Sequence, residues 1–452
     1  MYKQEGNHLS KQRDFTQGNL MGALIYFSGP IILAQLLQVS YQLVDSLWIG
    51  NLIGANALGA VNIAGVVIFT VLSFVIGINN STLTILSQQK GKGNEAGVAR
   101  YINAFVVTLT CIGVLMGLVG VIFAEPILQL LGTPSAMLDD STTYLQIHAV
   151  GILFLVGYNF ISTVLRAVGD SKTPLRIVGL AVLLNIVLDP LFIAGFDWGV
   201  QGAAVATIMS QGFSMIYGGW YVIRHQLIEW QRPHLPAWTE VKLILNLGIP
   251  SGLQMAIISA GAAAIMSVVT SHGEAAVAGY SAAQRLDSVI LLPAQALGAT
   301  VNSMAGQNIG VGKWDRVRKI ALLGVAYNTV IMLVFAGLLV LFADQAIRMF
   351  IQEIGAVQFG THYLMVIAFF YPFLGVNFVL NGIVRASGAM YQVMILNLLS
   401  FWILRYPLSY LMSEWLGETG IAYGIGMSFV ISSLLAFLYY RFGKWKNKQI
   451  FS

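Results

Sequence analysis

The chain has 452 residues, of which 57% are hydrophobic and only 10% are charged, with a formal net charge of +5. Soluble domains usually contain about 25% charged residues, so this composition excludes an ordinary soluble protein and predicts an all-α integral membrane protein. The basic residues lack the interleaved aromatic stripe of nucleic-acid-binding proteins. Their excess charge instead suits contact with anionic lipid of the bilayer.

Apolar segments long enough to cross about 30 Å of hydrocarbon as helices recur along the whole chain. We predict twelve, at residues 20–48, 54–80, 102–124, 143–166, 174–196, 199–223, 243–270, 276–304, 319–343, 361–384, 392–412 and 418–440. All Lys and Arg residues except Arg285, Arg348 and Arg405 lie at the two termini or in the loops of one side. Basic loops stay in the cytoplasm, so we expect a multi-pass protein of the inner or plasma membrane with both termini cytoplasmic.

The first segment carries a polar stripe that ends in a carboxylate. Its members recur at helical spacing and share one face: Gln38, Tyr41, Gln42 and Asp45. A charge at mid-bilayer costs several kcal/mol and is usually retained for ion or substrate handling. We interpret Asp45 as a proton- or cation-coupling group and the other three as residues lining its site. An acid needed only for folding, near the end of the segment, is the alternative.

The fifth segment holds a second carboxylate beside a proline. Asn185 and Asp189 are four residues apart and share a helix face. Pro190 has no N–H group, so the carbonyl of Ile186 loses its helical partner and the helix should bend, which makes Pro190 a candidate hinge. An amide oxygen, a carboxylate and a free carbonyl suit Na⁺ or a proton, and two neighbouring carboxylates titrate as a coupled pair. A structural capping acid is again the alternative.

The second half of the chain repeats the first. A shift of 219 residues, reduced to 218 near the end, superimposes matched pairs that include Gly54 with Gly273, Gln88 with Gln307, Arg166 with Arg385 and Gly202 with Gly420. Six segments per copy give both copies the same orientation, so an axis along the membrane normal should relate them. We therefore predict an N-lobe at residues 1–226, which carries the cation site, and a C-lobe at residues 227–452.

The two acids are not repeated. Asp45 falls on Ala264, and Asp189 falls on Leu408 or, at the shorter shift, on Pro407. If the repeated fold needed these carboxylates for stability, both copies should carry them. The asymmetry favours a working role for the first copy alone.

A third acid, Asp287, lies within the eighth segment of the second half. Arg285 is two residues away and points to another helix face, whereas Arg405 of the eleventh segment could pair with it across the lobe. A buried structural ion pair and a role in substrate binding or gating are both open for Asp287.

Several motifs together resemble the multidrug and toxic compound extrusion (MATE) family, and specifically its DinF-like branch, over essentially the whole chain. In the first half they are Asp45-x4-Gly50 followed by Gly54-Ala55, then Arg166-Ala-Val-Gly169-Asp170-Ser-Lys172-Thr-Pro174, Asn185-x3-Asp189-Pro190 and Gly199-x2-Gly202-Ala203-Ala204. In the second half they are Gln307-Asn308 and Arg385-Ala-Ser-Gly388.

The resemblance implies two six-helix lobes around a central cavity and efflux of drugs or organic cations driven by inward H⁺ or Na⁺. In the DinF-like branch the N-lobe site would comprise Asp45, Asn185 and Asp189, with Thr207 of the sixth segment as a further ligand, also for Na⁺. Gln38 and Tyr41 match positions lining that site. Other members carry acids in the seventh and tenth segments, where this chain has Gln254, Asn377 and Asn381. We therefore expect coupling in the N-lobe alone, with Gln254 and Asp287 as substrate-lining residues.

Other functions fit the sequence less well. The loop Gln88-Gln89-Lys90-Gly91-Lys92-Gly93-Asn94 lacks the Asp-Arg motif of the major facilitator superfamily. A flippase for a lipid-linked or amphipathic substrate is the closest alternative, but Arg285 and Arg405 are few for binding a pyrophosphate. A channel would repeat its polar groups in both halves. No GxxxxGK[ST] loop, Ser–His–Asp arrangement or metal cluster favours an enzyme. The sequence thus predicts a cofactor-free antiporter working by alternating access, active as a monomer.

Overall fold

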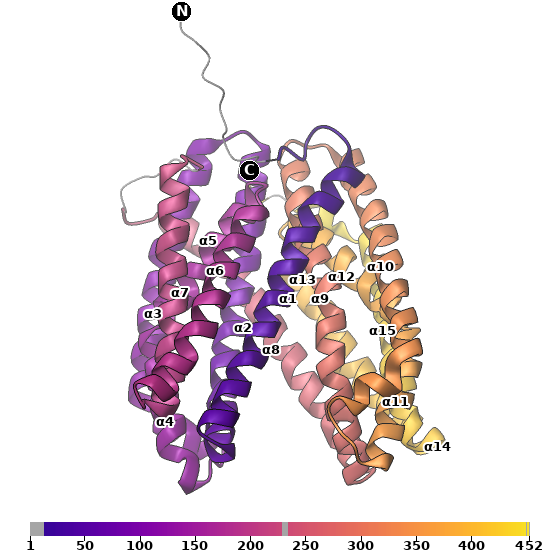
Figure 1. Ribbon diagram of the computed structural model, residues 1–452. Helices are drawn as coiled ribbons and strands as arrows, with labels where there is room; N and C mark the ends of the chain where they lie inside the picture. Colours follow the sequence, from indigo (N-terminus) through magenta and orange to yellow (C-terminus); the bar gives the residue numbers. More distant parts are fainter. Residues whose placement is uncertain (1–12, 228–233, 449, 452) are drawn as a thin grey trace, which may run out of the picture. The chain divides into compact units, whose positions relative to one another are not determined.

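The computed structural model describes residues 13–227, 234–448 and 450–451, and it is built from helices connected by short turns (Figure 1). Lys3, Lys11 and Arg232, which contribute to the predicted charge asymmetry, lie outside these residues. The chain divides into two compact units. The first comprises the described parts of Met1–Gln17 and Gly29–Leu245, and the second comprises Gly18–Ser28 with the described parts of Asn246–Ser452.

The helices of the first half are α1 (Leu20–Leu52), α2 (Ala55–Gly91), α3 (Glu95–Leu130), α4 (Ser135–Val150), α5 (Ile152–Ala167), α6 (Lys172–Pro190), the π-helix η1 (Leu191–Gly195) and α7 (Gly199–Arg224). Those of the second half are α8 (Trp238–Thr270), α9 (Glu274–Gly310), α10 (Trp314–Arg348), α11 (Ile354–Ala368), α12 (Tyr371–Ala386), α13 (Met390–Leu398), the π-helix η2 (Leu399–Arg405), α14 (Tyr406–Leu416), the short η3 (Gly417–Thr419), α15 (Gly420–Phe442) and η4 (Lys444–Asn447).

The helices that could cross a membrane are compatible with the twelve predicted segments. Within the described ranges, eight helical stretches are long and apolar enough to cross a membrane, or ten if two bent pairs, α4 with α5 and α11 with α12, each count as one crossing. The stretch Met390–Phe442 has 53 residues, too many for one crossing of about 30 Å at about 1.5 Å per residue. It folds back at η3, where α14 packs on α15. Counting that hairpin as two crossings and adding α7, with 26 residues, accounts for every predicted segment. The prediction of an all-helical membrane fold is confirmed.

Two helices begin in one unit and continue in the other. Residues 18–28, which include the first turns of α1, belong to the second unit, where Arg316 donates from Nη2 to the carbonyl of Gly18 over 3.2 Å. The first turns of α8 belong to the first unit, where Glu240 accepts an ion-pair contact of 2.8 Å from Arg100 Nε. α1 and α8 are the first helices of the two copies of the repeat. Each unit therefore contains the first turns of the other copy's first helix.

Matched glycines of the repeat have matched backbones. Gly54 and Gly273 have φ angles of 121° and 95°, and Gly169 and Gly388 have 93° and 88°. Only glycine adopts this region without strain, so the repeated spacing reflects repeated turns. After Gly169, Asp170 accepts hydrogen bonds of 3.0 Å at Oδ1 from the backbone N–H groups of Lys172 and Thr173 and thereby caps the start of α6. The motif around Arg166 to Pro174 therefore positions the helix that carries Asn185 and Asp189.

The interior of each unit is apolar around these helices. In the first unit, Ile49, Ala64, Leu128 and Ala203 belong to one fully or nearly fully buried cluster that joins α1, α2, α3 and α7. In the second unit, a larger cluster joins α8 to α12 and α15 and includes the buried rings of Tyr280, Tyr363 and Tyr371. Polar side chains within such surroundings require partners or a function.

Candidate functional site

The first unit brings four predicted residues together. Asn185 donates from Nδ2 to Asp189 Oδ1 over 2.9 Å, and the same Nδ2 lies 3.3 Å from Thr207 Oγ1. Tyr41 of α1 donates to that Thr207 oxygen over 3.4 Å. The exposed fractions of Asn185, Asp189 and Thr207 are 1%, 0% and 4%. Helices α1, α6 and α7 thus converge on one buried polar cluster.

Asp45 completes this cluster from α1, with 9% of its surface exposed. Its carboxyl group lies close enough to that of Asp189 for the two groups to interact. Ionised carboxylates only accept hydrogen bonds, so two of them in contact have no donor between them. Such a contact is satisfied when a proton or a cation lies between the two groups.

Three buried oxygen atoms at this position lack a hydrogen-bond partner among the described residues. They are Asp45 Oδ1, Asn185 Oδ1 and Asp189 Oδ2. A buried acceptor without a donor costs about 1–3 kcal/mol, and more when it is charged. Carboxylate and amide oxygens are also the ligands that hard cations prefer. This donor set therefore fits either a shared proton or Na⁺ as the transported ion.

The end of α6 departs from regular helical geometry next to the acids. Pro190 is the last residue of α6, and η1 follows immediately as a π-helix over Leu191–Gly195. Single π-helical turns are uncommon and often lie at functional sites. Gly202 of α7 packs against this turn so closely that a Cβ atom there would lie 2.7 Å from the carbonyl carbon and oxygen of Phe192. The role of Pro190 as a hinge stays a prediction.

Two stripe residues of α1 are not hydrogen-bonded to the cluster in the described part of the chain. Gln38 is half-buried and Gln42 is exposed. Neither side chain is hydrogen-bonded to Asp45, Asn185, Asp189 or Thr207 in the part of the chain that the structure describes. Sequence reasoning missed Tyr144 of α4, whose buried phenol lies close enough to Asp45 and Asp189 to interact electrostatically with both. Tyr144 falls on Tyr363 at the shift of 219 residues, and this match between the two copies was the available signal.

In the second unit, Asp287 of α9 is bound by tyrosines. Tyr363 donates to its Oδ2 over 3.2 Å, and Tyr371 donates to its Oδ1. Arg405 is not within ion-pair distance of this carboxylate. It donates from Nε to Ser428 Oγ over 3.3 Å and lies over the ring of Phe401, 3.8 Å from its centre.

The remaining predicted residues of the second unit do not join this group. Arg285 is exposed, with its guanidinium 5.7 Å from the ring centre of Phe350. Gln254 of α8 is 5% exposed, and its Oε1 has no partner within the described ranges. Asn381 donates to Asn377 over 2.7 Å, and Asn377 donates to the carbonyl of Ser432 over 3.1 Å.

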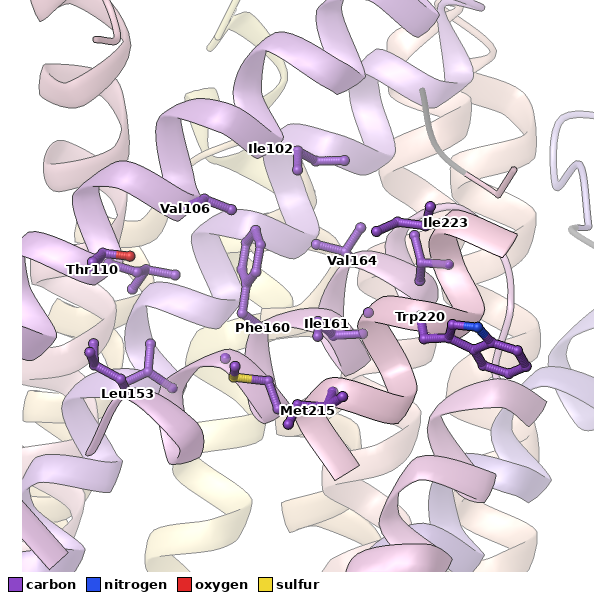
Figure 2. A pocket seen from close by; sticks show the side chains of 16 residues that line it. Ile102, Val106, Thr110, Leu153, Phe160, Ile161, Val164, Met215, Trp220 and Ile223 are labelled. Atoms are coloured by element: carbon purple, nitrogen blue, oxygen red, sulfur yellow. The ribbon is translucent and has the colours of Figure 1, made fainter. Parts of the chain in front are cut away.

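An apolar cavity of about 520 Å³ lies elsewhere in the first unit, between α3, α5 and α7. Figure 2 shows its lining, in which Thr110 is the labelled side chain with an oxygen atom and Phe160, Met215 and Trp220 contribute the larger groups. None of its lining residues belongs to the polar cluster. Its chemistry therefore differs from that of an ion site.

Comparison with known proteins agrees with the repeated fold. The MatE family matches residues 30–191 and again residues 250–411. The chain is 59% identical over 442 residues to "Probable multidrug resistance protein YpnP" of Bacillus subtilis (strain 168), covering 98% of this chain and 99% of that protein. It is 29% identical to "Probable multidrug resistance protein YoeA" of the same organism, with 94% of each chain covered.

A solved structure extends the likeness to three dimensions. It is an outward-facing conformation of a multidrug resistance MATE family transporter of the MOP superfamily, with a TM-score of 0.91 and 21% identity, covering 96% of this chain and 97% of that one. Both halves match the same family, and the helices of both halves form one known membrane fold. The chain therefore belongs to the MatE family of transporters, as the repeated motifs in its sequence suggested.

Proposed function

We propose that this protein is an H⁺- or Na⁺-coupled exporter of small amphipathic or cationic organic molecules, of the DinF-like branch. The buried cluster in which Asp45 and Asp189 lie close together carries the proposal, because its acceptor oxygens without a donor require a shared proton or cation. The 59% identity to a protein named as a multidrug resistance protein supports the substrate class.

The coupling step follows from the position of the acids. A proton or Na⁺ at Asp45 and Asp189 removes the repulsion between them and binds α1 to α6, while Asn185 and Thr207 orient the ligands. Loss of the ion separates the carboxylates again. Pro190 and the π-helix after it give α6 a place to bend, so ion binding and helix packing change together. Substrate and ion then compete for alternating states of the carrier.

The proposal also includes the boundaries of the two lobes, the orientation of the termini, the oligomeric state and the residues that line the substrate path. We assign the N-lobe to residues 1–226 and the C-lobe to residues 227–452, with both termini in the cytoplasm of a cell whose inner or plasma membrane holds the protein. The basic residues of the loops support this orientation. The transporter is proposed to function as a monomer with coupling in the N-lobe, and Gln38, Tyr41, Gln42 and Gln254 are assigned to the lining of the substrate path.

Reconstituted liposomes test the proposal. Purified protein would be placed in liposomes with ethidium, and a pH gradient and a Na⁺ gradient would be imposed separately. We expect one gradient to drive ethidium transport in the wild type and Asp45→Asn to abolish it. Asp315→Asn is the matched control, because this carboxylate is 93% exposed at the start of α10 and its removal should leave transport unchanged.

The outcomes separate the alternatives. Transport by Asp45→Asn at the wild-type rate would contradict the N-lobe coupling site. A folded wild type that moves ethidium under neither gradient would contradict drug export and would favour a flippase. In that case, movement of a fluorescent lipid between the leaflets of the same liposomes is the next measurement.

A further inference from the structure

Asp287 is a membrane-embedded carboxylate that the proposed N-lobe mechanism does not use. Each of its oxygen atoms accepts a hydrogen bond from a tyrosine of the bent pair α11 and α12. Tyr363 donates to Oδ2 over 3.2 Å, and Tyr371 donates to Oδ1. Two hydroxyl donors, one on each oxygen, stabilise the ionised form. These two hydroxyl groups can satisfy the carboxylate once it has lost its proton.

The charged groups around Asp287 do not neutralise it by contact. Arg405 of η2 interacts with it electrostatically but donates a hydrogen bond to Ser428 and lies over the rings of Phe401 and Phe429. Among the described residues, no Lys, Arg or His forms an ion pair with Asp287. The titratable groups around it are, by element, Tyr280 and the exposed Arg285 on α9, Tyr363 on α11, Tyr371 on α12 and Arg405 on η2. A structural ion pair, the simplest alternative, is thus not what holds this acid.

A polar cavity of about 250 Å³ adjoins the same tyrosine. It lies between α11, η3 and α15 and is lined by Gln358, Phe359, His362, Tyr363, Glu418, Thr419 and Ala422. Its polar groups offer the two to four partners that a water molecule needs, and its volume is ample for several. Tyr363 therefore belongs both to the wall of a hydrophilic cavity and to the hydrogen-bonded group around Asp287.

The first unit contains a related arrangement. Tyr144 is the repeat counterpart of Tyr363, and its phenol lies near Asp45 of α1. Asp287 comes from α9, whose counterpart in the first copy is α2, so a comparison of aligned positions does not pair these acids. In each unit, however, a buried tyrosine at the matched position lies near at least one intramembrane carboxylate. The two copies therefore retain similar chemistry on different helices.

We propose that Asp287 is a second proton-binding site of the transporter, loaded from the cavity beside α11 and η3 through the hydroxyl group of Tyr363. A hydronium ion in the cavity gives its proton to the Tyr363 oxygen, whose own proton passes to Asp287 Oδ2. Hydronium becomes water, Tyr363 is regenerated, and the carboxylate becomes a neutral carboxylic acid. The inference extends the proposed function, whose orientation places this cavity on the extracellular side, and it adds one proton carried by the second unit.

Infrared difference spectroscopy of the purified full-length protein tests this site without any transport. Protonated carboxyl groups have a carbonyl band distinct from that of carboxylates, and the probe is the pH alone. Between alkaline and mildly acidic pH, the wild type should gain such a band and Asp287→Asn should lose the intensity of one carboxyl group. Asp45→Asn should retain the Asp287 band. Identical spectra for the wild type and folded Asp287→Asn would overturn the proposal.

Two tyrosine variants keep the test decisive if Asp287→Asn does not fold. Tyr371→Phe and Tyr363→Phe each remove one donor to the ionised carboxylate, so the band should appear at a higher pH than in the wild type. After a rapid drop in pH, Tyr363→Phe should also gain the band at least tenfold more slowly, whereas Tyr371→Phe should not. Tyr410→Phe, at a half-exposed position on α14, is the control and should match the wild type. If both tyrosine variants match the wild type in their spectra and in the rate at which the band appears, Asp287 is not the proton-binding site. If the band appears at equal rates in the two variants, the proton does not pass through the hydroxyl group of Tyr363.

The stoichiometry of transport separates this inference from the proposed function. In ethidium-loaded liposomes, proton movement and ethidium movement would be recorded together for the wild type and Asp287→Asn. The variant should move one proton fewer per ethidium. An unchanged ratio would contradict a transported proton at Asp287. Absence of ethidium transport in every variant would instead contradict drug export, while the infrared band would still decide whether Asp287 binds a proton.

Discussion

Asn185 Nδ2 donates to Asp189 Oδ1 over 2.9 Å, one turn further along α6. Because the same nitrogen lies 3.3 Å from Thr207 Oγ1, one amide group orients the carboxylate and connects α6 to α7. Its carbonyl oxygen remains buried without a partner among the described residues. Asn185 therefore serves two purposes: its nitrogen positions Asp189, and its oxygen is available to an ion.

Removing this amide should weaken ion binding while leaving the acids in place. We expect Asn185→Leu to raise the ion concentration needed for half-maximal ethidium export at least tenfold, which corresponds to about 1.4 kcal/mol. The measurement is the initial export rate in liposomes as a function of the driving ion. Asn159→Leu is the control, because its amide donates to the carbonyl of Leu155 within α5 and to no other group in the described part of the chain. An unchanged ion dependence in Asn185→Leu would remove this residue from the site.

For ion binding and stability, the hydroxyl group of Thr207 should be more important than the branched shape of its side chain. Thr207→Val keeps the branched side chain but leaves Tyr41 and Asn185 without the oxygen that both contact. Loss of a buried partner costs about 1–3 kcal/mol, so the variant should bind the coupling ion more weakly and unfold at a lower temperature in detergent. Thr207→Ser restores the oxygen and should recover most of both properties. If Val and Ser variants behave alike, the hydroxyl is not used.

The sequence predicted the membrane fold well, because its signals are local. Apolar length identified each crossing segment, and the spacing of Asn185 and Asp189 on one helix face led directly to their hydrogen bond. The repeat was readable because glycines such as Gly54 and Gly273 occupy backbone conformations that other residues adopt only with strain. Thr207 was predicted as a site residue only from the family resemblance, because a single threonine in an apolar segment forms no pattern that the sequence alone could reveal.

The environment of Asp287 could not be read from the sequence. Its partners Tyr363 and Tyr371 lie 76 and 84 residues further along the chain. Arg405 was the natural candidate by charge, yet its guanidinium lies over aromatic rings instead. Cation–π contacts and tyrosine donors depend on how helices pack, which no periodicity within one segment specifies. Aligning the two halves also did not pair this acid with Asp45, because it comes from the counterpart of a different helix.

Pro190 should affect turnover more than substrate affinity. Pro190→Ala supplies an N–H group that can complete the hydrogen-bonding of α6, so the following π-helix should become regular and the helix stiffer. We expect the ethidium export rate to fall severalfold while ethidium binding, measured by fluorescence anisotropy, changes little. Pro126→Ala, within α3, a helix that contributes no residue to the polar cluster, is the matched control. An equal fall in the two variants would indicate a general effect of helix prolines.

Close packing at Gly202 should be needed both for stability and for ion coupling. A Cβ atom at this position would lie 2.7 Å from the carbonyl of Phe192, and backbone cannot yield as a flexible side chain can. Overpacking of this kind costs about 1–3 kcal/mol, so Gly202→Ala should unfold at a lower temperature. It should also displace η1 from α7, which separates Asp189 from Thr207 and weakens ion binding.

Two further glycines distinguish these effects. Gly420, the repeat counterpart of Gly202, lies against the carbonyl of Met412, so Gly420→Ala should also lower the unfolding temperature, but it should not separate Asp189 from Thr207, because both residues belong to the other unit. Gly65 in α2 has open space where a Cβ would lie, and Gly65→Ala should raise stability by about 0.5–1 kcal/mol. Stability and ion dependence would be measured on the same preparations. If Gly202→Ala is as stable as Gly65→Ala, η1 can move away from α7 at little cost in free energy. The close packing of Gly202 on Phe192 would then not be what holds Asp189 beside Thr207.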